Sequence, residues 1–223
     1  MPLSLAPLTI LPQHCKLCGA EFPADANAIC AECLGPLEPH YPAARTLPGR
    51  DEIAQRAPNL WRYREWLPFE GEPPYSRDTG FTPLVDAPRL ADALRVGRVW
   101  IKNDAVSQPT LSFKDRVVSV AIAKAREFGF EAMACASTGN LANSVAAHAA
   151  GAGMDCYVFI PDDLEQGKVV GSAIYNPTLV MVRGSYDDVN RLCTELSMAR
   201  PWAFVNINVR PYYAEGSRTL GYE

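Results

Sequence analysis

Short apolar segments alternate with longer helical ones through the second half of the sequence. The apolar segments occupy residues 98–104, 131–137, 155–161, 178–182 and 202–207. The helical patterns between them occupy residues 112–129, 140–153, 162–175 and 185–199. Apolar strands that alternate with helices of about 10 to 15 residues are typical of βαβ units, in which helices cover both faces of a parallel sheet. The sequence therefore predicts an α/β fold built on a parallel sheet.

Ligands of such sheets bind at the carboxyl ends of the strands, where loops lead into helices. The segment "ASTGN", residues 136–140, lies between a predicted strand and a predicted helix. Ser137 and Thr138 offer hydroxyl groups, Gly139 lets a ligand approach the backbone, and the helix N-terminus presents unpaired N–H groups. The segment therefore predicts a cradle for a carboxylate or a phosphate. Ordinary capping of a helix by Ser, Thr and Asn is the alternative interpretation.

Lys114 lies in the segment "PTLSFKDR", at the predicted first turn of a helix. The N-terminus of a helix carries partial positive charge, so a cation is unfavourable there. Phe113 and Val117 add apolar surface, which also disfavours a charged amine. A lysine whose neutral form is favoured is the nucleophile that forms Schiff bases with carbonyl compounds, including pyridoxal phosphate. A surface lysine paired with Asp115 is the alternative interpretation.

Four of the seven cysteines form a C-x2-C-x11-C-x2-C pattern, at Cys15, Cys18, Cys30 and Cys33. Two such pairs let four thiolates converge as the tetrahedron that zinc takes in closed structural sites. We therefore predict a zinc ribbon whose metal is structural, because no coordination position is left open for a substrate. A ribbon without metal and a redox-active pair are the alternatives. The odd total of cysteines argues against a disulfide framework.

The composition excludes several classes of function. The formal net charge is −4 at pH 7, and no run of lysine or arginine exceeds two residues, so a nucleic-acid or anionic-membrane partner has no basic patch to bind. No stretch approaches the roughly 20 apolar residues that a membrane helix needs. The first 14 residues contain three prolines and no lysine or arginine, which makes a poor signal peptide. We therefore expect a cytoplasmic protein.

The segments "PTLSFKDR" and "ASTGN" resemble those of threonine synthases, which belong to the tryptophan-synthase-β-like, fold type II pyridoxal phosphate enzymes. The segments "TGFTPLVDAPRL" and "VWIKND" resemble the lead-in of the same enzymes. The cysteine pattern, "WRYREWLP" and "VNINVRPYYAEGSRT" resemble the branch that carries a zinc ribbon. The resemblance covers nearly the whole chain. It implies a zinc ribbon at residues 1–40, a linker and docking helix at 41–78, and a pyridoxal-phosphate-dependent α/β domain at 79–223.

The resemblance also implies a role for each residue of the two segments. Lys114 would form the Schiff base with pyridoxal phosphate, and Asn140 would hydrogen-bond the 3′-oxygen of the cofactor. The α-carboxylate of the substrate would be held by Ser137, Thr138 and Gly139.

Two positions depart from the family. Leu111 stands where glycine is usual, which makes the turn into the helix less permissive. Leu141 stands where threonine is usual, which removes one hydroxyl from the predicted cradle.

The implied reaction converts O-phospho-L-homoserine and water into L-threonine and phosphate. Lys102 and Arg116 are candidates to bind the leaving phosphate because of their charge, and a pair of Arg116 with Asp115 is the alternative. A serine/threonine dehydratase or a β-replacement synthase shares the same lysine and loop, and a non-catalytic zinc-ribbon interaction protein is a further alternative. A hydrolase is disfavoured because only three histidines are present, and His148 lies mid-helix among alanines, where a packed residue is expected.

Threonine synthases extend beyond the point where this sequence ends, and the glycine-rich loop that holds the cofactor phosphate belongs to that later part. We therefore expect an amino-terminal portion of the fold with its carboxyl-terminal part absent, either as a fragment or as a natural truncation. The resemblance further implies a small amino-acid phosphate as substrate and a homodimer.

Overall fold

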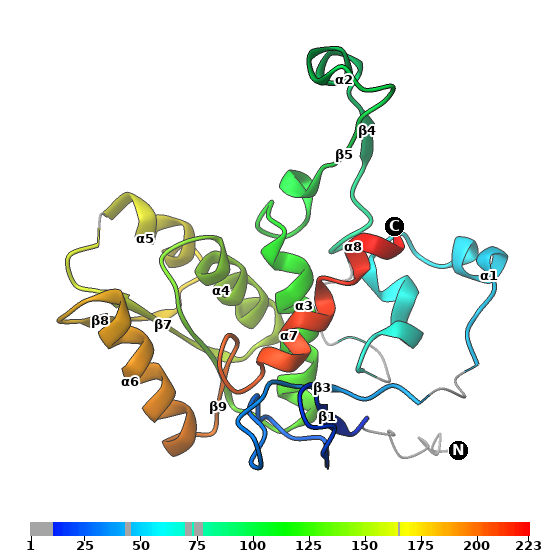
Figure 1. Cartoon of the computed structure of the whole chain (residues 1–223). Coiled ribbons are helices and arrows are strands. Elements are labelled where there is room, and N and C mark those ends of the chain that lie inside the picture. The colour runs from blue at the N-terminus through cyan, green and yellow to red at the C-terminus, as the bar shows by residue number, and fades with distance from the viewer. Residues whose placement is uncertain (1–10, 43–45, 70–72, 74–77, 165) are drawn as a thin grey trace, which may run out of the picture.

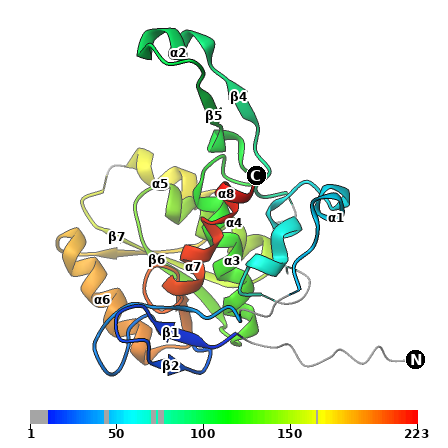
Figure 2. The ribbon, with the colours of Figure 1, turned by 45° about the vertical axis from the view of Figure 1, so that its right-hand side comes forward.

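A four-stranded parallel sheet forms the centre of the computed structural model, which describes residues 11–42, 46–69, 73, 78–164 and 166–223. The strand order is β8-β7-β6-β9; β7, β8 and β9 are labelled in Figure 1, and β6 is labelled in Figure 2. The strands are β6 (Ala132–Ala136), β7 (Asp155–Pro161), β8 (Thr178–Val182) and β9 (Trp202–Phe204). Ala134 in β6 pairs with Tyr157 in β7 and with Phe204 in β9. The predicted α/β fold with a parallel sheet is confirmed.

Helices cover both faces of this sheet (Figures 1 and 2). They are α3 (Lys114–Glu127), α4 (Asn140–Ala152), α5 (Gln166–Ala173), α6 (Tyr186–Ala199) and α7 (Arg210–Gly216). Successive strand residues point to opposite faces. Met133 and Cys135 therefore join the core shared with α3 and α4, whereas Ala134 packs with Val189 and Cys193 of α6. The helix predicted at 162–175 is shorter than expected, since α5 begins at Gln166.

The cysteine-rich segment folds as a small antiparallel sheet in the order β2-β1-β3. Its strands are β1 (Gln13–Cys15), β2 (Glu21–Phe22) and β3 (Leu37–Pro39). Two hydrogen bonds attach this ribbon to α7. Tyr212 Oη donates to the carbonyl oxygen of Asp25 at 3.1 Å, and Tyr41 Oη donates to Glu215 Oε2 at 2.6 Å. The ribbon therefore packs against the α/β body.

A short helical segment docks on the body, as the sequence predicts. After α1 (Arg50–Gln55), the chain forms a 3₁₀ helix, η1 (Leu60–Trp66), rather than an α-helix. Leu60, Trp61 and Leu67 pack against Val120 and Ala123 of α3. The division of the chain at residues 40 and 78 stays a prediction. Residues 1–10 and part of the linker lie outside the described residues.

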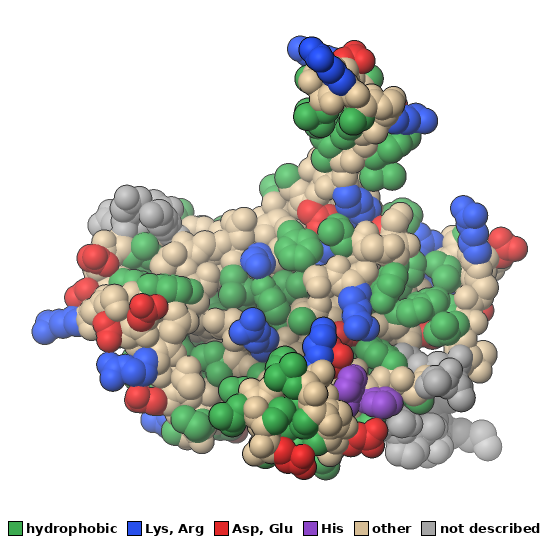
Figure 3. Space-filling view, viewed as in Figure 1, with side chains coloured by type: hydrophobic (Ala, Val, Ile, Leu, Met, Phe, Trp, Pro, Cys, Tyr) green, Lys and Arg blue, Asp and Glu red, His purple; other side chains and the backbone are tan. Residues whose placement is uncertain are grey.

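The strand expected at 98–104 exists, but it does not belong to the parallel sheet. Strand β5 (Trp100–Lys102) pairs antiparallel with β4 (Leu84–Asp86), and α2 (Pro88–Leu94) connects them. The two strands and α2 form an arm that projects from the body, as Figures 1 to 3 show. The expectation was wrong because an apolar alternation specifies a strand and not its partner, and a strand close by in the sequence often pairs first.

None of the helices in the described ranges is long and apolar enough to cross a membrane.

Candidate active site

Lys114 is the first residue of α3 and therefore lies in its first turn, as the sequence predicts. Its backbone N–H donates to Ser112 Oγ at 3.0 Å, which pairs one of the N–H groups that have no partner within the first turn of a helix. Its side chain is partly buried, and Nζ donates to Tyr213 Oη of α7 at 3.0 Å. The sequence did not indicate a role for Tyr213 beside Lys114, because the two residues are 99 positions apart. The hydrogen bond of Lys114 is with Tyr213 and not with Asp115, which was the alternative interpretation.

Asp115 fixes the start of α3. Its buried carboxylate accepts hydrogen bonds from Thr110 N at 2.9 Å, Thr110 Oγ1 at 2.7 Å and Ser112 N at 3.3 Å. It also accepts one from Ser144 Oγ in α4 at 2.8 Å. Because Ser144 lies one turn after Asn140, this bond holds the first turns of α3 and α4 together. A carboxylate at a helix N-terminus is favourable, and here it also orders the loop that leads to Lys114.

His148 is fully buried, so the expectation of a packed histidine is confirmed. Its Nε2 lies 3.0 Å from Ser119 Oγ, and its Nδ1 lies 2.9 Å from the carbonyl oxygen of Ser144. Burial lowers its pKa, which favours the neutral ring. The histidine therefore stabilises the contact between α3 and α4.

The loop 137–139 connects the carboxyl end of β6 to the N-terminus of α4, as predicted. Ser137 is buried and its Oγ accepts a hydrogen bond from Gly139 N at 3.4 Å. Thr138 is partly buried, whereas Gly139 and Asn140 are exposed. A Cβ atom added to Gly139 would meet nothing within 4 Å. The loop thus leaves open space in front of the first N–H groups of α4, where an anion can be bound.

The two positions that depart from the family behave differently. Leu111 has a φ of 58°, a left-handed conformation that favours glycine, and its side chain is exposed. Leu141 packs against the core shared by α3 and α4, so it takes part in folding rather than in the cradle.

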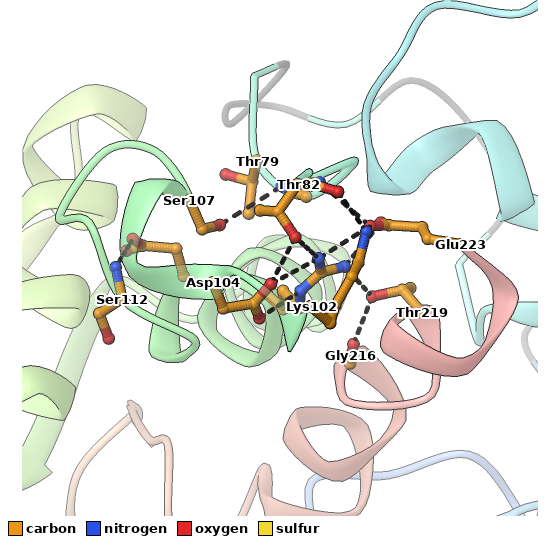
Figure 4. A network of polar contacts seen from close by, with 12 residues as sticks. Thr79, Thr82, Lys102, Asp104, Ser107, Ser112, Gly216, Thr219 and Glu223 are labelled. Atoms are coloured by element: carbon orange, nitrogen blue, oxygen red, sulfur yellow. Dashed lines mark hydrogen bonds and ion pairs between the residues drawn. The ribbon is translucent and has the colours of Figure 1, made fainter. Parts of the chain in front are cut away.

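Arg116 and Lys102 lie in a buried ion network (Figure 4). Arg116 Nε and Nη2 donate to the carboxylate of Asp104, in η2 (Asp104–Val106), at 2.7 and 2.9 Å. Its Nη1 and Nη2 donate to Glu223, which follows α8 (Thr219–Tyr222), at 2.6 and 2.8 Å. Lys102 Nζ lies 2.7 Å from Glu223 Oε2 and also donates to the carbonyl oxygen of Thr82.

This network corrects the expectation that the two cations bind a substrate phosphate or that Arg116 pairs with Asp115. Burial lowers the pKa of Arg116, but the hydrogen bonds to Glu223 and Asp104 outweigh it and hold the pKa above its usual value. The guanidinium is fully buried and already forms two bidentate pairs. Arg116 is therefore structural, and the contacts of both cations with Glu223 connect the base of the arm to α3 and α8.

The four ribbon cysteines lie together, with all their Sγ atoms within 4.8 Å of one another. The Sγ atoms of Cys15 and Cys33 are 3.4 Å apart, and those of Cys18 and Cys30 are 3.7 Å apart. Both distances are far beyond the ~2.05 Å sulfur–sulfur bond of a disulfide. The N–H groups of Leu17 and Glu32 donate to the Sγ atoms of Cys15 and Cys30, at 3.4 Å each. A backbone hydrogen bond at Cys18 is the main cause that lowers the pKa of Cys15 to about 6. The four thiols are free and converge on one point, as metal ligands do.

A family model described as "Pyridoxal-phosphate dependent enzyme" matches residues 75–223, more than half of the chain. The chain belongs to this family. Membership agrees with the parallel sheet and with the positions of Lys114 and the loop 137–139 described above.

Two relatives are similar to the chain in sequence, and one solved structure is similar to it in fold. Threonine synthase of Methanosarcina acetivorans is 33% identical over 211 residues, which are 94% of this chain and 51% of that protein. Threonine synthase of Synechocystis sp. is 37% identical over 198 residues, which are 84% of this chain and 51% of that protein. The structure of the processed form of threonine deaminase isoform 2 from Solanum lycopersicum superimposes with a TM-score of 0.59 at 22% identity. The match covers 80% of this chain and 46% of that chain, and it shows that the two share a fold. The chain spans about half the length of the curated relatives it matches.

Proposed function

We propose that the protein is a threonine synthase, a pyridoxal-phosphate-dependent lyase that converts O-phospho-L-homoserine and water into L-threonine and phosphate. The observation that carries this proposal is the extent of the similarity. The family model begins at residue 75, whereas the similarity to the threonine synthase of M. acetivorans covers 94% of the chain and so extends into the ribbon. A ribbon shared with threonine synthases favours this enzyme over a dehydratase or a β-replacement synthase.

The side chains present in the chain fit the cofactor and an amino-acid substrate. Lys114 offers a primary amine at the start of α3, and its Nζ lies 5.8 Å from the ring centroid of Phe113 and 5.7 Å from that of Tyr213. The loop 137–139 offers hydroxyl and N–H groups beside open space. Bound pyridoxal phosphate supplies a sink for electrons from the α-carbon of the amino acid.

In this proposal each of these residues has a defined role. Lys114 holds the cofactor through its amine and moves protons at the α and β carbons of the substrate as general base and acid. Asn140, whose side chain is exposed at the start of α4, donates a hydrogen bond to the 3′-oxygen of the cofactor. The α-carboxylate of the substrate is bound by Ser137, Thr138 and Gly139. An amino-acid phosphate is thus the substrate class, while a homodimer and a cytoplasmic location stay predictions.

We also propose that the ribbon binds one structural zinc ion. A zinc–sulfur distance of about 2.3 Å in a tetrahedron separates neighbouring sulfurs by about 3.8 Å, close to the 3.4 and 3.7 Å of the two cysteine pairs. A side chain on Gly35 would come within 2.9 Å of Cys15 Sγ, so the turn after the second pair has room only for glycine. The donor set and its packing therefore support a closed zinc site.

The proposal is tested on the whole protein loaded with pyridoxal phosphate and zinc. Phosphate release from O-phospho-L-homoserine and ammonia release from L-threonine are measured side by side. Fast phosphate release supports a threonine synthase, and fast ammonia release without it identifies a dehydratase and contradicts the proposal. Lys114→Ala is expected to abolish turnover and the visible absorption of the bound cofactor. Lys16→Ala, on the exposed ribbon surface, is the matched control and is expected to retain both.

A further inference from the structure

Tyr213 reaches Lys114 from a helix far along the chain. Lys114 Nζ lies 3.0 Å from Tyr213 Oη. Both side chains are partly buried, so the contact is sheltered from solvent without being closed off. A phenol hydroxyl can accept a hydrogen bond from an ammonium group and donate one to a neutral amine. The pair can therefore stay hydrogen-bonded whether or not the lysine carries a proton.

The fold, and not the lysine, sets the position of the Tyr213 hydroxyl. A Cβ atom on Gly216 of α7 would lie 2.5 Å from the carbonyl oxygen of Arg116, so the α7 backbone rests directly on α3. Helix α7 also contacts the cysteine-rich part of the chain, since Tyr212 donates to the carbonyl oxygen of Asp25 at 3.1 Å and Glu215 accepts from Tyr41 at 2.6 Å. Helix α7 is thus held by both the ribbon and the helix that begins with Lys114.

We propose that Tyr213 is a positioning residue for Lys114. Its hydroxyl binds the lysine amine whenever the amine is not bonded to the cofactor, and it keeps Nζ within reach of the substrate carbons. A lysine side chain otherwise samples many rotamers, and proton transfer requires the amine at hydrogen-bonding distance from its target. The inference rests on the proposed function, since it gives a task to the neighbour of the cofactor lysine.

The first test measures the amine itself, without turnover. Zinc-loaded protein freed of pyridoxal phosphate is treated with a small amine-acylating reagent, and mass spectrometry follows labelling of Lys114 in the wild type, Tyr213→Phe and Tyr157→Phe. Loss of one hydrogen bond is expected to make Lys114 react about fivefold faster in Tyr213→Phe. Tyr157→Phe also removes a phenol hydroxyl, but its ring packs with Trp202 and α6 on the other face of the sheet, so this variant is expected to label Lys114 at the wild-type rate.

The second test separates positioning from binding in the holoenzyme. With O-phospho-L-homoserine, Tyr213→Phe is expected to lower kcat about tenfold and to leave KM within about twofold, because the hydroxyl positions the lysine and does not bind the substrate. The substitution removes only a hydroxyl at a partly buried position, so the fold is retained and circular dichroism verifies it.

An unchanged rate of Lys114 labelling, or an unchanged kcat, in Tyr213→Phe overturns the inference. Lys114→Ala distinguishes this failure from failure of the proposed function. If that variant loses turnover and cofactor absorption while Tyr213→Phe behaves as wild type, only the role of Tyr213 is wrong. If Lys114→Ala keeps both, the proposed function is wrong and the inference falls with it.

Discussion

Gly216 of α7 lies so close to Arg116 of α3 that a Cβ atom on the glycine would be 2.5 Å from the carbonyl oxygen of the arginine. The same atom would lie 2.6 Å from the Cα of Val117. Backbone atoms cannot turn aside as the end of a flexible side chain can. The distance between α3 and α7, and with it the contact of Tyr213 with Lys114, therefore depends on a position that has no side chain.

Gly216→Ala is expected to lower the free energy of unfolding by about 2–3 kcal/mol, because α7 must move away from α3 to make room for a methyl group. Urea unfolding measures the change. Gly221→Ala is the matched control, since Gly221 is exposed on α8 and its Cβ would meet nothing within 4 Å. Alanine is the better helix former there, so the control is expected to be neutral or slightly stabilising. Equal stability of the two variants would contradict the close approach of the helices.

The free energy of unfolding in urea is expected to be about 1 kcal/mol higher for Leu111→Gly than for Leu111→Ala. In a helix the order is the reverse, since alanine is more stabilising than glycine there. The backbone at this position has a φ of 58°, which strains any residue with a Cβ atom and not glycine. The leucine side chain is 56% exposed, so both variants lose little burial. A higher stability of the alanine variant would show that the turn before Lys114 does not have this conformation.

Glu223 is expected to make the protein sensitive to acid. Burial raises the pKa of this carboxyl group, but hydrogen bonds from Arg116 and Lys102 outweigh it, and the pKa in the folded state lies below its usual value of 4.5. The unfolded state therefore binds more protons, so stability rises with pH. The contribution of Glu223 is fully present above pH ~4.5 and is lost as the pH falls through the lower pKa of the folded state.

The measurement is urea unfolding between pH 6 and about pH 3. Wild type is expected to lose more stability than Glu223→Gln below pH ~4.5, because the amide has no proton to bind. Glu215→Gln is an informative comparison, since burial raises the pKa of Glu215 and the sign of its contribution is opposite. Parallel curves for wild type and Glu223→Gln would contradict the role of the network.

Removal of zinc is expected to loosen α7 as well as the ribbon. Wild type should contain about one zinc ion per chain by atomic emission spectroscopy, and Cys30→Ser should contain little, because three thiolates no longer close the site. Hydrogen exchange at 210–216 is expected to speed up in Cys30→Ser, since the bonds at Tyr212 and Glu215 need a folded ribbon. Cys156→Ser, outside the ribbon, should keep the metal. Unchanged exchange in α7 would show that the ribbon does not support it.

The sequence predicts most of the elements that local pattern determines. Strand β8 has the predicted bounds, Lys114 lies in the first turn of α3 as expected, and the loop at 137–139 follows its strand. The partners of single residues were harder to predict. Nothing near Arg116 indicates that Glu223, 107 residues later, neutralises it, and Tyr213 is equally remote from Lys114. Such contacts depend on how helices pack against one another, and the apolar periodicity of one helix does not indicate which helix packs on it.

The position of Asp115 resolves the apparent misplacement of a cation at the start of a helix. Its buried carboxylate balances the partial positive charge at the N-terminus of α3 and accepts hydrogen bonds from Thr110, Ser112 and Ser144. The start of the helix is therefore stable although Lys114 places an amine there. In the proposed function, stability and chemistry therefore depend on adjacent but separate side chains, Asp115 and Lys114. An inactive Lys114 variant should consequently keep the native architecture and serve as a trap in which substrates can be captured unreacted.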